Sequence, residues 1–229
     1  MVAGYSAAQV RAAEAPHLAA GEPLMRRAAA ALAATLRREL AELGAPDGPV
    51  VLLVGSGDNG GDALWAGAEL AAAGVAVTAI PTSERMHDEG AQAARNAGAR
   101  ILEPTGADDD TIAAAFDGAA VIVDGILGTG TSASPALRGR ARELVGAASR
   151  AIEPRGIRVV AVDLPSGIQP DDGSVPDPTV LRADVTVTFG AIKAGLLREP
   201  AAGYAGRIEL VDLGLGPELA SMTPLVTVD

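Results

Sequence analysis

The sequence predicts a single three-layer α/β domain of the Rossmann-like type, in which helices flank a mostly parallel central sheet. Two observations predict it. Short apolar, β-branched runs alternate along the 229 residues with segments of helical periodicity, the pattern of parallel βαβ units. Three of these runs lead directly into glycine-rich loops that each carry a carboxylate: Gly57–Asp62, Asp124–Gly130 and Asp163–Gly167. Because parallel strands end at the same edge of a sheet, we expect the three loops to form one crevice.

The predicted elements follow in a regular order. Ser6 and Gln9 form a capping-box pattern that starts a first helix, which runs to about His17. A second helix covers Leu24–Leu43 behind Pro23, with its leucines at helical spacing, and we expect both N-terminal helices to pack outside the sheet. The remaining strands are expected at 50–54, 75–80, 100–102, 120–123, 159–162, 183–189 and 207–211, and the remaining helices at 61–73, 87–97, 109–116 and 137–151.

Composition and charge argue against several classes of protein. The formal net charge of −11 argues against nucleic acid and anionic membranes as partners, because those surfaces are bound through Lys and Arg. The apolar runs are far shorter than the ~20 residues of a membrane span and no signal peptide opens the chain, so we expect a cytoplasmic protein. The chain has no cysteine, and His17 and His87 lie outside the glycine-rich loops, which disfavours zinc and thiol chemistry.

The first loop contains the motif of a dinucleotide-binding fold. Residues 55–60 read G-x-G-x-x-G between a strand and a helix, which by itself predicts an NAD-dependent oxidoreductase. Those enzymes bind the ribose through an acidic residue at the end of the second strand, whereas the nearest acid here is Glu84, beyond Pro81. The loop is also unusually polar, and a role in capping the helix explains only one of Asp58, Asn59 and Asp62.

The second and third loops add further oxygen donors. Asp124 and Asp163 each end a strand, and the amides of Gly128–Gly130 form a candidate phosphate nest. Each loop alone is equally well explained as a tight βα turn. Together the loops offer Asn59, Asp124 and Ser166, which are hard oxygen ligands without nitrogen or sulfur. Such a set favours an alkali or alkaline-earth cation, and the spacing does not choose among potassium, sodium and magnesium.

In this order and at these separations, the loops resemble those of the NAD(P)H-hydrate epimerases, the YjeF N-terminal family. Further matching segments lie at 7–14, 24–25, 183–196 and 211–214, so the resemblance covers nearly all of residues 1–229. It implies an isomerase that interconverts the R and S forms of NADH or NADPH hydrated at nicotinamide C6 (NADHX and NADPHX). It also implies a homodimer, and a dehydratase, fused downstream in many bacteria, that repairs only the S form. The strand-like stretch at 225–229 is compatible with such a fusion.

Carried over residue by residue, the resemblance implies a substrate site and a potassium site. One potassium ion per subunit would be held by Asn59, Asp124 and Ser166, and Asp124 is predicted to carry the acid–base chemistry. The family's usual Asn-Asn-Gly-Gly-Asp-Gly begins here with Asp58, which adds a negative charge beside an anionic ligand. The implied substrate residues are Asp58, Asn59, Gly60, Gly61 and Asp62, then Gly128, Thr129, Gly130, Thr131, Ser132, Ala133 and Ser134, and finally Asp163.

The implied reaction inverts a hemiaminal carbon. C6 can lose hydroxide and take up water on the other face, or the ring can open to an aldehyde and close again. Either route needs proton transfer at the C6 oxygen, which is the role predicted for Asp124. Two alternatives stand beside this interpretation: a non-catalytic nucleotide-binding or scaffold domain, and the NAD-dependent oxidoreductase suggested by the first loop.

Overall fold

Seven parallel strands form the central sheet. The computed structural model describes residues 1–104, 109–130 and 134–228. The strands lie in the order β4-β3-β2-β5-β6-β7-β8, and each neighbouring pair is parallel. From β2 the strands are added toward one edge of the sheet, and from β5 toward the other. Open parallel sheets bind their ligands at such a switch point, which here lies between β2 and β5. The predicted α/β fold is therefore confirmed, with β2 at Val50–Val54, β3 at Val77–Pro81, β4 at Arg100–Ile101, β5 at Val121–Gly125, β6 at Arg158–Val162, β7 at Val185–Phe189 and β8 at Arg207–Val211.

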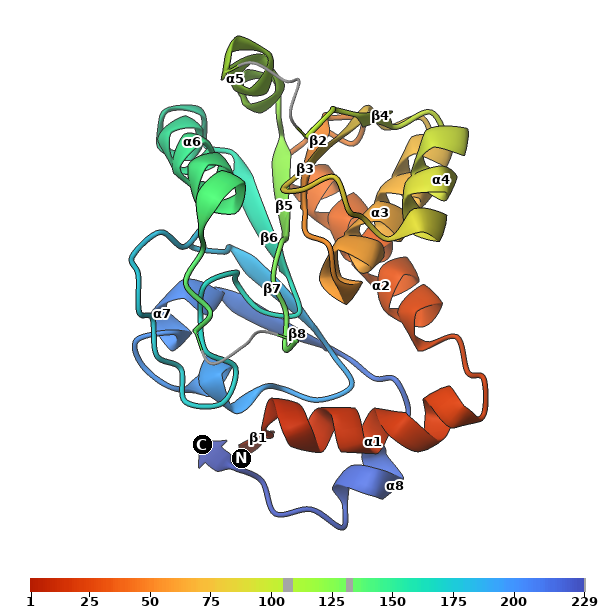
Figure 1. Cartoon of the computed structure of the whole chain (residues 1–229), viewed down its shortest axis with the longest axis vertical. Helices are drawn as coiled ribbons and strands as arrows, with labels where there is room; N and C mark the ends of the chain where they lie inside the picture. Colours follow the sequence, from red (N-terminus) through yellow and green to blue (C-terminus); the bar gives the residue numbers. More distant parts are fainter. Residues whose placement is uncertain (105–108, 131–133, 229) are drawn as a thin grey trace.

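Helices cover both faces of this sheet, as Figure 1 shows. One face carries α2 (Leu24–Glu42), α3 (Asp58–Ala72) and α4 (Asp88–Asn96), and the other carries α5 (Asp109–Asp117) and α6 (Gly139–Arg155). Alternate strand residues supply the two cores. Val50, Leu52 and Val54 belong to the core under α2 and α3, whereas Val51 and Leu53 belong to the core under α6. None of the helices in the described parts of the chain has the length and apolarity needed to cross a bilayer.

Helix α1 (Ala7–Ala19) lies at the edge of the sheet where the loops are, rather than on either face (Figure 1). The predicted capping box is confirmed, since the Ser6 hydroxyl accepts from the Gln9 amide at 3.1 Å and the Gln9 side chain accepts from Ser6 N at 2.9 Å. Arg11 donates to the carbonyl oxygen of Thr129 at 3.0 Å. The first helix therefore faces the second glycine-rich loop, a placement that the helical periodicity could not give.

The pairing of the two termini was not predicted, although the stretch at 225–229 is strand-like in sequence. Strand β1 (Val2–Gly4) pairs antiparallel with β9 (Val226–Val228) to form a second, two-stranded sheet. Each strand is only three residues long, and the paired residues are more than two hundred positions apart. A local sequence pattern therefore carries little signal for this pairing. Three short helical turns complete the chain: η1 (Ala194–Leu197), α7 (Ala202–Ala205) and α8 (Gly216–Leu219).

Helix α3 begins three residues earlier than predicted. Gly57 is its N-cap, so Asp58, Asn59 and Gly60 form the first helical turn rather than a loop. The two consecutive glycines conceal this start, because glycine disfavours a helix interior. Gly60 is required by packing: a Cβ at this position would lie 2.1 Å from the carbonyl oxygen of Gly55. The close approach of helix and strand positions the polar first turn beside the ends of β5 and β6.

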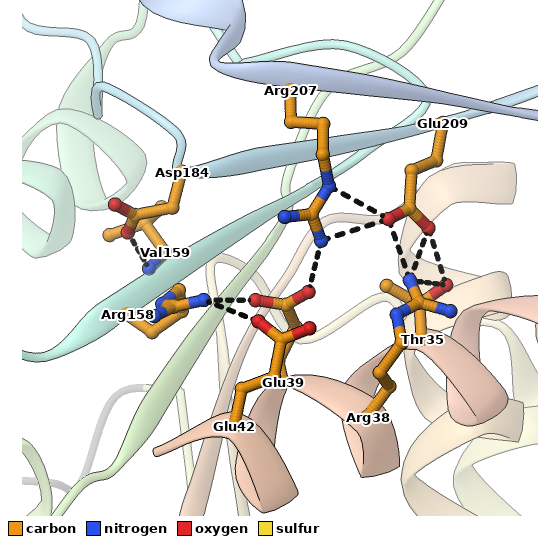
Figure 2. A network of polar contacts seen from close by, with 9 residues as sticks. All are labelled: Thr35, Arg38, Glu39, Glu42, Arg158, Val159, Asp184, Arg207 and Glu209. Atoms are coloured by element: carbon orange, nitrogen blue, oxygen red, sulfur yellow. Dashed lines mark hydrogen bonds and ion pairs between the residues drawn. The ribbon is translucent and has the colours of Figure 1, made fainter.

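A buried carboxylate ties α2 to the opposite end of the sheet (Figure 2). Glu39 is fully enclosed, and it binds Arg158 and Arg207, the first residues of β6 and β8. Beside them Glu209 binds Arg38 at 2.5 Å and extends the network. Since the guanidinium groups compensate the buried charge, the helix is fixed at the amino ends of these strands, far from the glycine-rich loops.

Glu39→Gln is expected to lower the free energy of unfolding by about 1–3 kcal/mol, because two arginines lose a buried ionic partner. Urea denaturation measures the change. Glu42→Gln is the matched control: its carboxylate is half-exposed, bonds Arg158 at 3.5 Å, and should contribute less than about 0.5 kcal/mol. Equal losses in the two variants would contradict the role given to the buried network.

Candidate functional site

Asp124 and Ser166 join the ends of β5 and β6. The backbone amide of Ser166 donates to Asp124 Oδ2 at 2.8 Å, and the Ser166 hydroxyl donates to Oδ1 at 2.6 Å. The same hydroxyl accepts from the amide of Leu127 at 2.8 Å. Both residues are fully buried. Burial raises the pKa of Asp124, and the hydrogen bonds from Ser166 oppose that rise. The second and third loops are therefore held together by an enclosed carboxylate.

Asn59 connects this pair to α3. Its side-chain amide donates to the carbonyl oxygens of Val162, at 2.5 Å, and Leu127, at 3.2 Å. Gly128 packs directly on the amide, since a Cβ there would lie 2.1 Å from Asn59 Oδ1. The three residues predicted as cation ligands thus come together from three loops, in one hydrogen-bonded unit at the switch point of the sheet.

The donor chemistry of this unit fits a hard cation. It combines a carboxylate, a hydroxyl, an amide oxygen and two main-chain carbonyls, all of them oxygen donors. If the Asn59 amide were rotated by half a turn, its oxygen would face the carbonyl oxygens of Val162 and Leu127. A cation between these oxygens would compensate their mutual repulsion. Among the described residues no cluster of three His, Cys, Asp or Glu side chains suits a transition metal.

Asp163 forms a second buried unit with Lys193. Its φ is +68°, a left-handed conformation that non-glycine residues rarely adopt and that is concentrated at functional sites. Asp163 Oδ1 accepts from the Lys193 ammonium group and from the hydroxyl of Thr188, the latter at 3.2 Å. Lys193 is only 2% exposed, and it also donates to the carbonyl oxygen of Phe189 at 2.8 Å. The charges of Asp163 and Lys193 therefore compensate each other inside the protein.

Asp62 lies beside this ion pair without one of its own. Its side chain is buried, and its Oδ1 has no hydrogen-bond partner among the described residues. Burial, followed by the negative charges of Asp163 and Asp58, raises the pKa of Asp62 well above the usual value, against a smaller opposing effect of Lys193. Asp58, in contrast, is exposed in the first turn of α3. The first loop therefore supplies one solvated and one enclosed carboxyl group.

A pocket of about 470 Å³ opens beside the second loop, at the ends of β2, β3 and β5. Ser56, Thr82 and Leu127 line it, together with Gly130 and Ser134 from the implied substrate loop. Its size is within the range of small-molecule sites. Thr131, Ser132 and Ala133 lie outside the described residues. A larger groove of about 1090 Å³ lies between α5 and α6 and contains none of the predicted site residues.

A comparison with protein families identifies the relationship. The family model for the YjeF-related protein N-terminus matches residues 21–195. The chain belongs to this family. Family membership covers β2 through β7 and includes every predicted site residue.

Relatives and a solved structure agree with this family. An NAD(P)H-hydrate epimerase of Clavibacter michiganensis is 54% identical over 224 residues, which cover 97% of this chain and 94% of that protein. A bifunctional NAD(P)H-hydrate repair enzyme of Mycobacterium tuberculosis is 41% identical over 216 residues, or 92% of this chain and 41% of that one. The crystal structure of yeast ynu0 has a TM-score of 0.72 at 20% identity, covering 88% and 86% of the two chains, and supports the fold.

The sequence analysis assigned no role to three residues that lie at or beside this site. They are Lys193, Arg11 and Glu14, the last of which lies close enough to the ion pair to feel the charges of Lys193 and Asp163. One signal was available for Lys193. It is the only lysine in a chain whose other basic side chains, histidine aside, are arginines. A compact ammonium suits this closed position, where it donates to Asp163, Thr188 and the Phe189 carbonyl oxygen, better than a planar guanidinium does.

Gly128→Ala is expected to lower the free energy of unfolding by about 1–3 kcal/mol. The new methyl group would displace the Asn59 amide from the carbonyls that it bonds. Chemical denaturation measures the loss. Gly130→Ala is the control, because a Cβ there meets none of the described residues within 4 Å, and its effect should stay within about 0.5 kcal/mol. Equal losses of unfolding free energy in the two variants would show that the packing of Gly128 on the Asn59 amide does not stabilise the protein.

Proposed function

We propose that this chain is an NAD(P)H-hydrate epimerase, which interconverts the R and S forms of NADHX and NADPHX at nicotinamide C6. The observation that carries the proposal is the assembly of Asn59, Asp124 and Ser166 at the switch point of the sheet, in a chain 54% identical to a relative of that name. An oxidoreductase lacks support, since β3 ends at Pro81 without an acid for the ribose.

The proposed reaction inverts C6 by exchange of water. C6 carries a hydroxyl group and is bonded to the ring nitrogen, so the nitrogen lone pair can expel the protonated hydroxyl as water and form an iminium ion. Water then adds to the opposite face and loses a proton. A carboxyl group that moves this proton contributes about 10²–10⁴-fold to the rate of such a step. The sequence-based assignment of that role to Asp124 stays a prediction.

Nucleotide binding is assigned to the first turn of α3 and to the second loop. The first amides of a helix such as α3 have no partner within the helix, and such amides bind phosphate without basic side chains. This suits a chain with a net charge of −11 that must bind an anionic substrate. We place substrate contacts on residues 58–62, 128–134 and Asp163, with the pocket beside Gly130 and Ser134 receiving part of the nucleotide.

Potassium is the cation that we propose for the Asn59, Asp124 and Ser166 unit, with one ion in each subunit. The ion would supply positive charge beside the anionic substrate and would hold the three loops together. The protein's own residues provide the enclosure: Leu127 and Val162 contribute carbonyl oxygens, and Ser166 fixes the orientation of the Asp124 carboxylate.

Three further proposals concern the setting of the reaction. The S epimer would pass to an NAD(P)H-hydrate dehydratase, an activity consistent with the bifunctional name of several relatives. We also propose a homodimer, as the resemblance implies, and a cytoplasmic location. Neither nucleic acid nor a membrane is proposed as a partner, given the acidic charge.

The direct test mixes purified R-NADHX with the protein in potassium buffer and follows the S epimer by chromatography. We expect the approach to equilibrium to be faster than the spontaneous background, and Asp124→Asn to lose at least ~10²-fold of that acceleration. Asp117→Asn is a control on exposed α5 and should keep full activity. A folded wild-type protein that does not accelerate the exchange would leave a non-catalytic nucleotide-binding or scaffold domain.

Potassium should also raise the thermal midpoint of the protein relative to a tetramethylammonium buffer of equal ionic strength. An ion that binds only the folded state adds RT ln(1 + [K⁺]/Kd) to stability. The increase should vanish in Asp124→Asn and persist in Asp117→Asn. An equal midpoint in both buffers would remove potassium from the proposal while leaving the epimerase assay unaffected.

A further inference from the structure

The carboxyl group of Asp62 is enclosed, yet one of its oxygens has no partner. The residue lies on α3, one turn after Asp58, and it is 6% exposed. Oδ1 has no hydrogen-bond partner among the described residues, whereas buried carboxylate oxygens are ordinarily hydrogen-bonded. A partner from a ligand would satisfy this atom.

Within the described part of the chain, no cationic side chain pairs with the carboxyl group of Asp62. The nearby charges are those of Asp163, Asp58, Glu14 and Lys193, which come from the loop after β6, from α3, from α1 and from the segment after β7. The ammonium group of Lys193 is already used, since it donates to Asp163, to Phe189 O and to Thr188 Oγ1. On the α4 side, His87 lies against Gly61 and uses Nδ1 to cap that helix.

These neighbours favour a proton on Asp62. Burial is the largest cause, and three negative neighbours add to it, so the pKa of Asp62 is raised well above the usual value. A neutral carboxylic acid in a substrate site is a hydrogen donor at a pH where an ordinary aspartate is not.

Asp124 is placed differently. Its side chain is fully buried, and both oxygens accept hydrogen bonds from within the protein, from Ser166 and from the Ile126 amide. Both oxygens of Asp124 therefore already have protein partners, whereas Asp62 Oδ1 has none among the described residues. The geometry therefore suits Asp124 to holding the loops and the proposed cation, rather than to contact with C6.

We infer that Asp62, rather than Asp124, is the catalytic acid that protonates the C6 hydroxyl, an assignment that rests on the proposed epimerase function. Asp62 transfers its proton to the C6 oxygen, the C6–O bond breaks, and the departing oxygen takes the bonding electrons and leaves as water. The ring-nitrogen lone pair forms the C=N bond of the iminium ion. Water then adds to the other face and returns a proton to the Asp62 carboxylate, so that nothing is oxidised or reduced.

Asp62→Asn is the sharpest test, because it keeps the size and shape of the side chain and removes the acidic proton. With R-NADHX as the probe, kcat should fall at least ~10²-fold while KM changes less than about threefold. Glu69→Gln, on the same helix and partly exposed, is the control and should leave both constants unchanged. Retention of more than about a third of kcat in Asp62→Asn would overturn the assignment.

The pH dependence gives a second readout that a merely structural role would not move. Activity that needs protonated Asp62 should fall at alkaline pH. Glu14→Gln removes a negative neighbour, lowers the pKa of Asp62, and should move this alkaline limb to lower pH by about 0.3–1 unit. An unmoved limb would contradict the assignment even if Asp62→Asn failed to fold.

The pH dependence of the free energy of unfolding tests for the proton on Asp62 without any assay of activity. Above the ordinary aspartate pKa of about 3.9, the unfolded chain releases a proton that folded Asp62 retains, so the free energy of unfolding falls as pH rises toward the raised pKa. Asp62→Asn should remove this part of the pH dependence, and Glu69→Gln should not.

If wild-type protein is inactive, the proposed function fails and the catalytic assignment fails with it. If the wild type is active and Asp62→Asn matches it, only the assignment to Asp62 fails.

Discussion

The hydrogen bonds between Asp124 and Ser166 are the constraint on which the rest of the site depends. They fix the loop after β6 against the end of β5, and Asn59 adds the first turn of α3 by donating to carbonyls of both segments. Parallel strands bring their carboxyl ends to one edge, but they leave the loops free to diverge. A buried carboxylate that satisfies an amide and a hydroxyl removes that freedom, because breaking the contact leaves a charged group without partners in a dry interior.

The carboxyl groups of the site differ in their surroundings, and this difference separates their roles. Asp124 is bonded on both oxygens, Asp163 is neutralised by the buried Lys193, and Asp58 is exposed. Asp62 alone among these four is enclosed with an oxygen that has no partner in the described structure. In the proposed account, backbone amides and a cation bind the anionic substrate, and the raised pKa of Asp62 suits this carboxyl group to donate a proton.

The sequence predicted the layers and the convergence of the loops, because apolar strand runs and glycine-rich turns are local patterns. It placed the start of α3 too late, because glycine disfavours a helix interior. The close contact of Gly60 with the Gly55 carbonyl oxygen, which requires glycine there, is a tertiary feature. The pairing of β1 with β9 and the Lys193–Asp163 ion pair join residues far apart in sequence, so no local pattern reports them. The loops themselves offered Asn59, Asp124 and Ser166 as predicted cation ligands, and the resemblance to the family added potassium as the expected ion. The enclosure of Asp124 and the unpartnered oxygen of Asp62 depend on three-dimensional packing.

The most direct test of the account is to incubate R-NADHX with the protein in water enriched in oxygen-18. The epimers are then separated, and mass spectrometry measures the oxygen-18 content of each. Inversion through loss and re-addition of water predicts that the S epimer forms faster than without protein and carries the heavy oxygen from its first appearance. An S epimer that forms rapidly but keeps the original oxygen would contradict water exchange and favour ring opening. No enzyme-dependent S epimer at all would contradict the proposed function.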